Sequence, residues 1–516
     1  MIDSKRIAKN TGFLYIRMLL IMAVTLYTSR VILNALGADN YGLYNLVGGI
    51  VSMLAFLNGT LATATSRFLT FDIGIGDFKR LKQTFSTSFF SHFALGCIVV
   101  VLMETVGLWF VLNKAIIPAE RLEATLWVFH ISVATVLITF TQVPYTSLIM
   151  AHEQMKAFAY ISLLEAVLKL AIAYLIVVSP IDQLVFYAIL MFITQFSIAM
   201  IYRYYCYRRW DESHVTKNFN ILTLKEMMRF SGWNIISHCA ETLRSQGLVM
   251  LFGMFFQPVV VAAQAVATQL SYGITQFTNN FRTAINPQII KLYAARQYDE
   301  SRKLTLESSI YVFELFLLIG IPVLLLTEPI MKLWLKEVPE YAVAFSQCII
   351  VSAMMGTYSS AFYTPLTAAG KLKRNSVAAF FVCGGQFILA YILLKCNLSV
   401  MWVQYSYITV SFLFAFIIKP YLLVKDLGYR VPEFINCFGR SFFILVLSSV
   451  LPFIVAQHVN KESFLGFIVV VVISVVNVLI VAWVFLSKEV KVNLLMLVKS
   501  KLAACLLYTS PSPRDS

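Results

Sequence analysis

The chain has 516 residues, of which 59% are hydrophobic and only 13% charged, and its mean hydropathy is +0.77. Because a typical soluble domain is about 25% charged, this composition excludes a water-soluble fold and predicts an integral membrane protein. The net charge of +15 is dispersed over many short polar segments with no folded domain to carry it, which argues against nucleic acid binding.

Apolar windows of about 20 residues, separated by short polar segments, predict an all-α membrane protein with about fourteen transmembrane helices. The window at 341–368 contains Pro365, at which we expect a break. The predicted helices lie near residues 12–34, 43–66, 85–112, 123–150, 157–178, 182–202, 231–256, 259–283, 308–331, 341–368, 375–395, 399–418, 441–458 and 463–487.

The distribution of Lys and Arg predicts the orientation of these helices. With the N-terminus inside, the cytoplasmic segments, among them 419–440, carry 28 Lys or Arg, whereas the external loops carry six. Cytoplasmic loops of membrane proteins are enriched in positive charge. Both termini are therefore predicted to be cytoplasmic.

Two arginine pairs indicate an internal repeat. Arg30 and Arg67 are 37 residues apart, Arg244 and Arg282 are 38 apart, and each pair flanks a predicted helical hairpin. Parallel repeats of this kind are typical of transporters, so two six-helix lobes plus two C-terminal helices are expected. The predicted organisation is an N-lobe at 1–210, a cytoplasmic linker at 211–230, a C-lobe at 231–436, the last two helices at 437–487, an amphipathic cytoplasmic tail at 488–504, and a segment at 505–516 that looks like the translation of a sequencing adapter.

The four arginines are also the candidate binding residues, because charge at membrane depth is costly and usually faces the protein interior. Two interpretations are open for Arg30, Arg67 and Arg282: a side chain that snorkels to the interface, or a cation that binds phosphate in a cavity. Arg244 lies deeper and has Glu241 three residues before it, so the two form a local ion pair or line a wet cavity.

Other ionisable residues in the predicted helices are candidates for pairing or for ion coupling. Glu165 and Lys169 have the i, i+4 spacing of a helical ion pair, and His238 precedes Glu241 by one turn. Glu104 and Glu314 are lone carboxylates that could bind a coupling ion, either a proton or sodium. The sequence contains no metal-ligand spacing and no GxxxxGK[ST] phosphate loop, so no metal, cofactor or catalytic residue is expected.

The opening hairpin, "SRVILNALGADNYGLYNLVGGIVSMLAFLNGTLATATSRF", resembles that of lipid-linked oligosaccharide flippases. These belong to the multidrug/oligosaccharidyl-lipid/polysaccharide (MOP) superfamily and include the O-antigen and capsule flippases. The matching features are Arg30, Leu36-Gly37, Tyr41-Gly42 and Arg67. The segment "FRTAINPQIIKLYA", with Pro287, also resembles the end of the eighth helix in that family.

The resemblance implies a transporter rather than an enzyme. It would move a polyprenyl-pyrophosphate-linked oligosaccharide across a bacterial cytoplasmic (inner) membrane by alternating access, with arginines that neutralise the pyrophosphate. Polysaccharide polymerases and glycosyltransferases are then expected partners, along with membrane lipids. Two alternatives stay open: a cation-coupled multidrug exporter of the same superfamily, and a membrane polysaccharide polymerase or glycosyltransferase, against which the absence of a large predicted loop argues.

Overall fold

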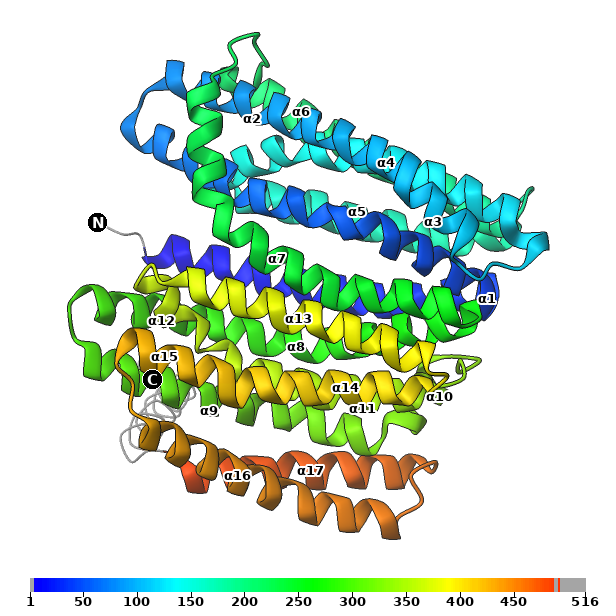
Figure 1. The fold of residues 1–516 in the computed structure, drawn as a ribbon, viewed down its shortest axis with the longest axis vertical. Helices are drawn as coiled ribbons and strands as arrows, with labels where there is room; N and C mark the ends of the chain where they lie inside the picture. The colour runs from blue at the N-terminus through cyan, green and yellow to red at the C-terminus, as the bar shows by residue number, and fades with distance from the viewer. Residues whose placement is uncertain (1–3, 487–490, 492–516) are drawn as a thin grey trace, which may run out of the picture.

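The computed structural model describes residues 4–486 and Lys491, with side chains from Leu20 onward except at 230, 231, 233, 234, 237, 283 and 284. The described chain is built from helices joined by short turns, as the composition predicts (Figure 1). They are α1 (Ser4–Ile75), α2 (Phe78–Leu102), η1 (Met103–Gly107), α3 (Leu108–Asn113), η2 (Ala119–Arg121), α4 (Leu122–Ala151), α5 (Met155–Leu175), η3 (Ile176–Val178), α6 (Gln183–Arg209), η4 (Asp211–Ser213), α7 (Ile221–Phe255), α8 (Pro258–Ala294), α9 (Tyr298–Leu325), α10 (Thr327–Trp334), α11 (Ala342–Ser360), α12 (Tyr363–Ala368), α13 (Leu372–Lys395), α14 (Val400–Leu413), η5 (Phe414–Ile418), α15 (Lys419–Leu427), α16 (Val431–His458) and α17 (Phe464–Phe485).

The predicted all-α membrane fold is confirmed. Within the described residues, eleven helical segments are long and apolar enough to cross a membrane. One of them, α1, is interrupted at Gly37, whose backbone (φ 75°, ψ 168°) is one that glycine adopts readily. The chain turns back there, so α1 supplies two arms. The second arm of α1, together with the long but more polar α7 and α8, accounts for the rest of the fourteen predicted crossings.

Several element boundaries differ from the prediction; for example, α9 and α16 begin at Tyr298 and Val431, each ten residues before the predicted start. The window at 341–368 breaks after Ser360, before α12 begins at Tyr363, rather than at Pro365. Helix α7 begins at Ile221, so the second half of the predicted linker is helical. The predicted tail at 488–504, except Lys491, and the adapter-like segment at 505–516 lie outside the described residues.

The helices form two groups in Figure 1. One group holds α2 to α6, which together with α1 we call the first lobe, and the other holds α7 to α15, which we call the second lobe; α16 and α17 lie beside the second lobe on the side away from the first. Helix α1 contacts α2, α4 and α5 of its own lobe and also α7 and α8 of the other. The two arms of α1 therefore form the seam between the lobes.

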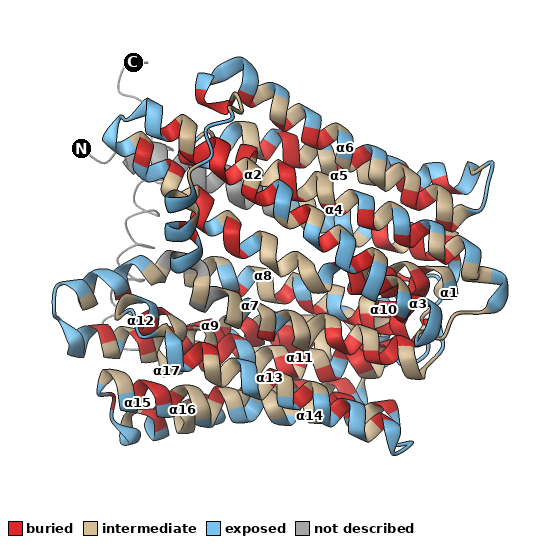
Figure 2. Cartoon of the chain, turned by 45° about the horizontal axis from the view of Figure 1, so that its top comes forward, coloured by how far each residue is buried: buried red, intermediate tan, exposed pale blue. Residues whose placement is uncertain are grey.

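The apolar cores differ at the two ends of this seam. Near the Gly37 turn, one continuous cluster joins both lobes; it includes Leu36 and Leu46 of α1, Phe252 of α7 and Met331 of α10. Figure 2 shows many buried residues around α1, α3 and α10 at this end. Toward the end where α1 begins, the larger clusters are separate, with one around Phe85 in the first lobe and another that joins the second lobe to α16 and α17. The lobes are thus fused by packing at the α10 end.

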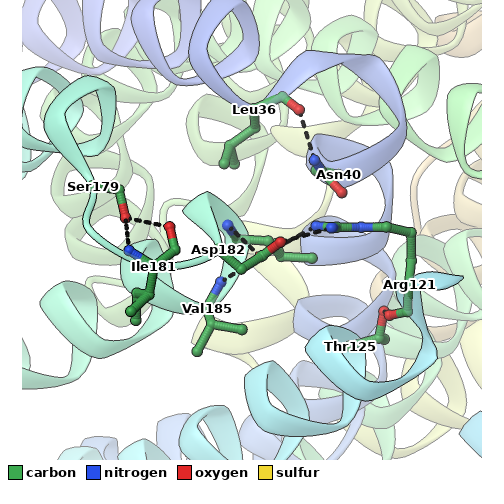
Figure 3. Close-up of polar contacts among 9 residues, drawn as sticks. Leu36, Asn40, Arg121, Thr125, Ser179, Ile181, Asp182 and Val185 are labelled. Carbon is green, nitrogen blue, oxygen red and sulfur yellow. Dashed lines mark hydrogen bonds and ion pairs between the residues drawn. The ribbon is translucent and has the colours of Figure 1, made fainter.

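A polar cluster fixes the connections of the first lobe at the α10 end (Figure 3). Arg121, just before α4, donates to both carboxylate oxygens of Asp182 at 2.7 and 3.2 Å. The same carboxylate accepts the backbone N–H groups of Leu184 and Val185 as the N-cap of α6. The start of α4 is thereby tied to the start of α6.

Candidate functional site

A cavity of about 870 Å³ lies mainly within the second lobe, where the second arm of α1 closes one side, and we call it the central cavity. Its walls come from the second arm of α1 and from α7, α8, α11, α13 and α14, with Lys419 at the start of α15. On α8 the lining runs from Val261 to Arg282, which is about 32 Å at 1.5 Å per residue. The cavity therefore extends through most of the thickness of a bilayer core, which is about 30 Å.

The central cavity explains why α7 and α8 are less apolar than the other long helices. The polar residues of these two helices that line it are Glu241, Arg244, Ser245, Gln246, Gln264, Thr268, Gln269, Ser271, Thr275, Asn279 and Arg282. A helix that is polar on one face lowers its mean hydropathy. Here that face borders a cavity rather than lipid, so the polar side chains avoid the cost of contact with hydrocarbon.

Arg244 is held in the wall of the central cavity by two contacts. Its Nη2 and Nε donate to the carboxylate of Glu241 at 2.6 and 3.1 Å, which is a bidentate pair within α7. Its guanidinium also lies over the ring of Tyr407, 4.7 Å from the centroid. The pair has the geometry that the i, i+3 spacing predicts, and both members line the cavity.

Lys419 is another cation of the cavity, and it was not predicted from the sequence. The hydropathy window ended at residue 418, so Lys419 was counted with the cytoplasmic segment 419–440. In the structure the π-helical turn η5 continues directly into α15, and Nζ donates to the backbone oxygen of Ser359 at 3.0 Å. The cue available in the sequence was a lysine directly after an uninterrupted apolar helix.

Arg282 lines the same cavity, far along α8 from its start. Its Nε is buried and has no hydrogen-bond partner among the described residues. A buried donor without a partner is costly, so a shift of the side chain that brings this nitrogen to an acceptor is favourable. Arg244, Arg282 and Lys419 carry three positive charges against the single carboxylate of Glu241. The described lining therefore has an excess of two positive charges.

A second, smaller cavity of about 420 Å³ lies in the first lobe, and we call it the N-lobe cavity. Its walls are both arms of α1, α5 and α6, with Gln269 of α8. Glu165 and Lys169 lie in this wall, and Lys169 Nζ donates to Glu165 Oε1 at 2.6 Å. The i, i+4 pair predicted from the sequence therefore forms and faces a cavity.

Arg30 and Arg67 are not among the described residues that line either cavity. Arg30 Nη1 donates instead to the backbone oxygen of Leu333 in α10, at 3.4 Å, and so connects the two lobes. Arg67 is exposed, and its guanidinium lies 5.8 Å from the ring centroid of Phe68. His238 is exposed on α7, one turn before Glu241, and is also outside the described cavity lining.

The two lone carboxylates lie elsewhere. Glu104, in the π-helical segment η1, pairs with His130 of α4 at 2.9 Å. Glu314 of α9 is 7% exposed, and its Oε1 has no hydrogen-bond partner among the described residues. Neither residue lines the cavities. No group of three or more His, Cys, Asp or Glu in the described part of the chain is arranged to hold a metal ion.

Comparison with known proteins identifies the fold. The MatE family model matches residues 234–392, a segment that runs from α7 to α13 and includes much of the wall of the central cavity. No curated protein matches the sequence. Several solved structures share the fold.

Among these structures, the lipid II flippase MurJ in an inward closed conformation has a TM-score of 0.66 at 13% identity, over 91% of this chain and 98% of that one. A multidrug resistance MATE family transporter of the MOP superfamily, in an inward-facing conformation, has a TM-score of 0.65 at 14% identity, over 80% of this chain and 99% of that one. A MOP superfamily transporter from Pyrococcus furiosus, described as having a binding pocket of reverse polarity, has a TM-score of 0.59 at 14% identity, over 82% of this chain and 97% of that one. The chain thus has the same fold as these proteins.

Proposed function

We propose that this protein is a transporter that moves a polyprenyl-pyrophosphate-linked oligosaccharide across the bacterial cytoplasmic membrane. The observation that carries the proposal is the charge of the central cavity, where Arg244, Arg282 and Lys419 face one carboxylate, Glu241. A pyrophosphate is anionic and cannot cross hydrocarbon without counter-charge and hydrogen-bond donors. The wall of the central cavity offers both.

The contacts of the three cations indicate different roles in binding the pyrophosphate. Arg244 is already neutralised by Glu241, so it contributes mainly donors and a fixed aromatic neighbour. Lys419 donates only to uncharged oxygens of Ser359 in the hydrogen bonds described, and Arg282 has a buried nitrogen without a partner. Arg282 and Lys419 are therefore the stronger candidates for direct contact with pyrophosphate.

Alternating access fits the two-lobed fold. The lobes share an apolar core at the α10 end and have separate larger cores at the other end. The distribution of Lys and Arg over the polar segments predicts that the second end is cytoplasmic, and we infer that this conformation accepts cargo from the inner leaflet. Release to the outer leaflet requires the α10 end to separate. Coupling to a proton or sodium ion, and partnership with a polymerase and glycosyltransferases, stay predictions.

The test is transfer of the lipid-linked sugar in liposomes. Purified protein would be reconstituted with a polyprenyl-pyrophosphate oligosaccharide, and a membrane-impermeant glycosidase would report the fraction in the outer leaflet. We expect Arg282→Gln and Lys419→Met each to slow transfer about tenfold or more, as expected for loss of a hydrogen bond to a charged group. The matched control is Lys395→Gln, which removes an exposed charge at the end of α13, outside the described cavity lining. Transfer at wild-type rates in both cavity variants would refute the proposal.

A second function has its own support. The MatE match covers much of the wall of the central cavity, which favours export of organic cations, with Glu241 as the binding carboxylate. The same liposomes, loaded with ethidium in place of the glycolipid, separate the two functions. Export of ethidium that depends on Glu241, without transfer of the sugar lipid, would establish the second function instead.

A further inference from the structure

The N-lobe cavity differs chemically from the central cavity. Its charged residues, Glu165 and Lys169, neutralise one another at 2.6 Å. The described lining therefore has no excess charge, in contrast to the excess of two cations next to it. A free anion gains little from a site in which a carboxylate already occupies the only ammonium group.

Aromatic rings with hydroxyl groups form part of the wall. Tyr44 of α1 and Tyr187 of α6 have ring centroids 4.6 Å apart at an interplanar angle of 58°. Tyr41 and Tyr187 are 8% and 5% exposed, so a large ring surface is fixed in place by packing. A tyrosine ring presents an apolar face together with a hydroxyl that donates and accepts.

Four more polar side chains line the wall. Ser29, Asn45 and Ser162 donate to backbone oxygens of their own helices and offer their side-chain oxygens as acceptors, whereas Thr28 differs from them. Thr28 is only 7% exposed, yet its Oγ1 has no hydrogen-bond partner among the described residues. A buried hydroxyl without a partner is costly. This hydroxyl therefore favours a ligand with polar groups of its own over an acyl chain.

The two cavities adjoin. Four residues line both of them: Tyr41, Tyr44, Asn45 and Gln269. One molecule with two chemically different parts can therefore occupy both cavities at once. Each volume falls within the range of about 300–1,000 Å³ that is usual for small-molecule sites.

We propose that the N-lobe cavity binds a sugar ring of the cargo while the central cavity binds its pyrophosphate. This inference rests on the proposed function and names the part of the substrate that each cavity recognises. A sugar ring is uncharged, its hydroxyls both donate and accept, and its C–H faces pack on aromatic rings. Glu165 accepts from sugar hydroxyls, Lys169 donates to them, and Tyr44 and Tyr187 cover the ring. The protein thus selects for a glycan as well as for a charged lipid.

Binding of two probes tests the assignment. The first is undecaprenyl pyrophosphate, and the second is the same lipid bearing a tetrasaccharide, because Gln269, which lines both cavities, is about 20 Å along α8 from Arg282. Affinities would be measured with purified protein in detergent. We expect Tyr44→Ala and the double variant Glu165→Gln/Lys169→Met to weaken binding of the sugar-bearing lipid about tenfold, as loss of a stacking or hydrogen-bonding contact implies. Binding of the bare lipid should be unchanged.

The matched control is Tyr160→Ala, which removes a 64% exposed tyrosine from the same helix as Glu165 and should alter neither affinity. If Tyr44→Ala does not fold, the double variant carries the test, because it preserves both side-chain sizes and the net charge. Equal weakening of both probes, or of neither, would overturn the sugar site. Failure of the proposed function has a separate signature, since wild-type protein would then bind neither probe.

Discussion

Trp334 donates its indole N–H to the backbone oxygen of Leu26 at 2.8 Å, although 308 residues separate them. The contact joins α10 of the second lobe to the first arm of α1. Next to it, Arg30 donates to the backbone oxygen of Leu333. Another interlobe bond runs from the backbone N–H of Ile116 to the backbone oxygen of Gly253 at 2.7 Å. These bonds lie where the common apolar core joins the lobes, so together they hold the lobes in contact at this end, and we call this junction the gate.

Removal of the indole hydrogen bond should weaken this gate. Trp334→Phe keeps an aromatic ring but loses the donor to Leu26, and a net hydrogen bond is worth about 0.5–1.5 kcal/mol. We expect the fraction of molecules open at the α10 end to rise about two- to tenfold. The measurement is the labelling rate of a cysteine at Ser245, which lines the central cavity, by an impermeant maleimide added on the α10 side, with the native cysteines replaced by serine. An unchanged rate would show that this bond does not hold the gate, and Trp402→Phe, at a 54% exposed position, is the control.

Neutralisation of Glu241 distinguishes an anionic cargo from a cationic one. Glu241→Gln removes the carboxylate that neutralises Arg244 and raises the positive excess of the central cavity from two to three. We expect affinity for undecaprenyl pyrophosphate to rise by about three- to tenfold, because the variant removes a negative charge that repels the pyrophosphate in a site of low dielectric constant. Affinity for ethidium should fall. The reverse pattern, measured in the same detergent, would favour the cation exporter, and Glu340→Gln at an exposed position should change neither affinity.

The sequence could predict local pairs but not partners on other helices. The bond between Glu241 and Arg244, and that between Glu165 and Lys169, follow from the helical repeat and were predicted from spacing alone. His130, the partner of Glu104, is on another helix, and no pattern in the sequence connects the two. The order and approximate limits of the helices were predictable for the same reason, since apolar length is a local property.

The direction in which a side chain points also could not be predicted from the sequence. The sequence left two interpretations open for Arg30, and its contact with Leu333 could not be foreseen because it depends on how the second lobe docks. Lys419 was assigned to a loop because hydropathy marks the end of an apolar run and not the end of a helix. The tyrosine wall of the N-lobe cavity likewise depends on α1 and α6 meeting in space.

Close packing at the gate predicts a steric variant. A Cβ at Gly42 would overlap the backbone oxygen of Pro258 at the start of α8, so Gly42→Ala must push the two helices apart. Overpacking of this kind costs about 1–3 kcal/mol, and the cost falls on the state in which the lobes are closed at the α10 end. We expect a lower Tm of the detergent-solubilised protein and faster labelling at the Ser245 position from the α10 side. Gly59→Ala, on the same arm with no atom within 4 Å of its Cβ, should leave both quantities at wild-type values, and a wild-type result for Gly42→Ala would contradict the packing.

The ion pair of Figure 3 predicts a pH-dependent stability. Burial by itself would raise the pKa of Asp182, but the hydrogen bond from Arg121 and those from the backbone of α6 outweigh it and hold the pKa below its ordinary value. The unfolded chain has an aspartate pKa of about 3.9. At pH values around the two pKa values, it therefore binds more protons than the folded protein. The stabilisation is therefore complete above the unfolded pKa and is lost as the pH falls through the folded value.

Asp182→Asn can still cap α6 but cannot form the ion pair, so it should lower stability at pH 7 by about 1 kcal/mol or less for so exposed a pair. The Tm difference from wild type, measured from pH 7 down to pH 3, should shrink below about pH 4, whereas Asp39→Asn at an exposed position should show little difference at any pH. A difference that stayed constant down to pH 3 would mean that Asp182 stabilises the protein through capping geometry and not through its charge.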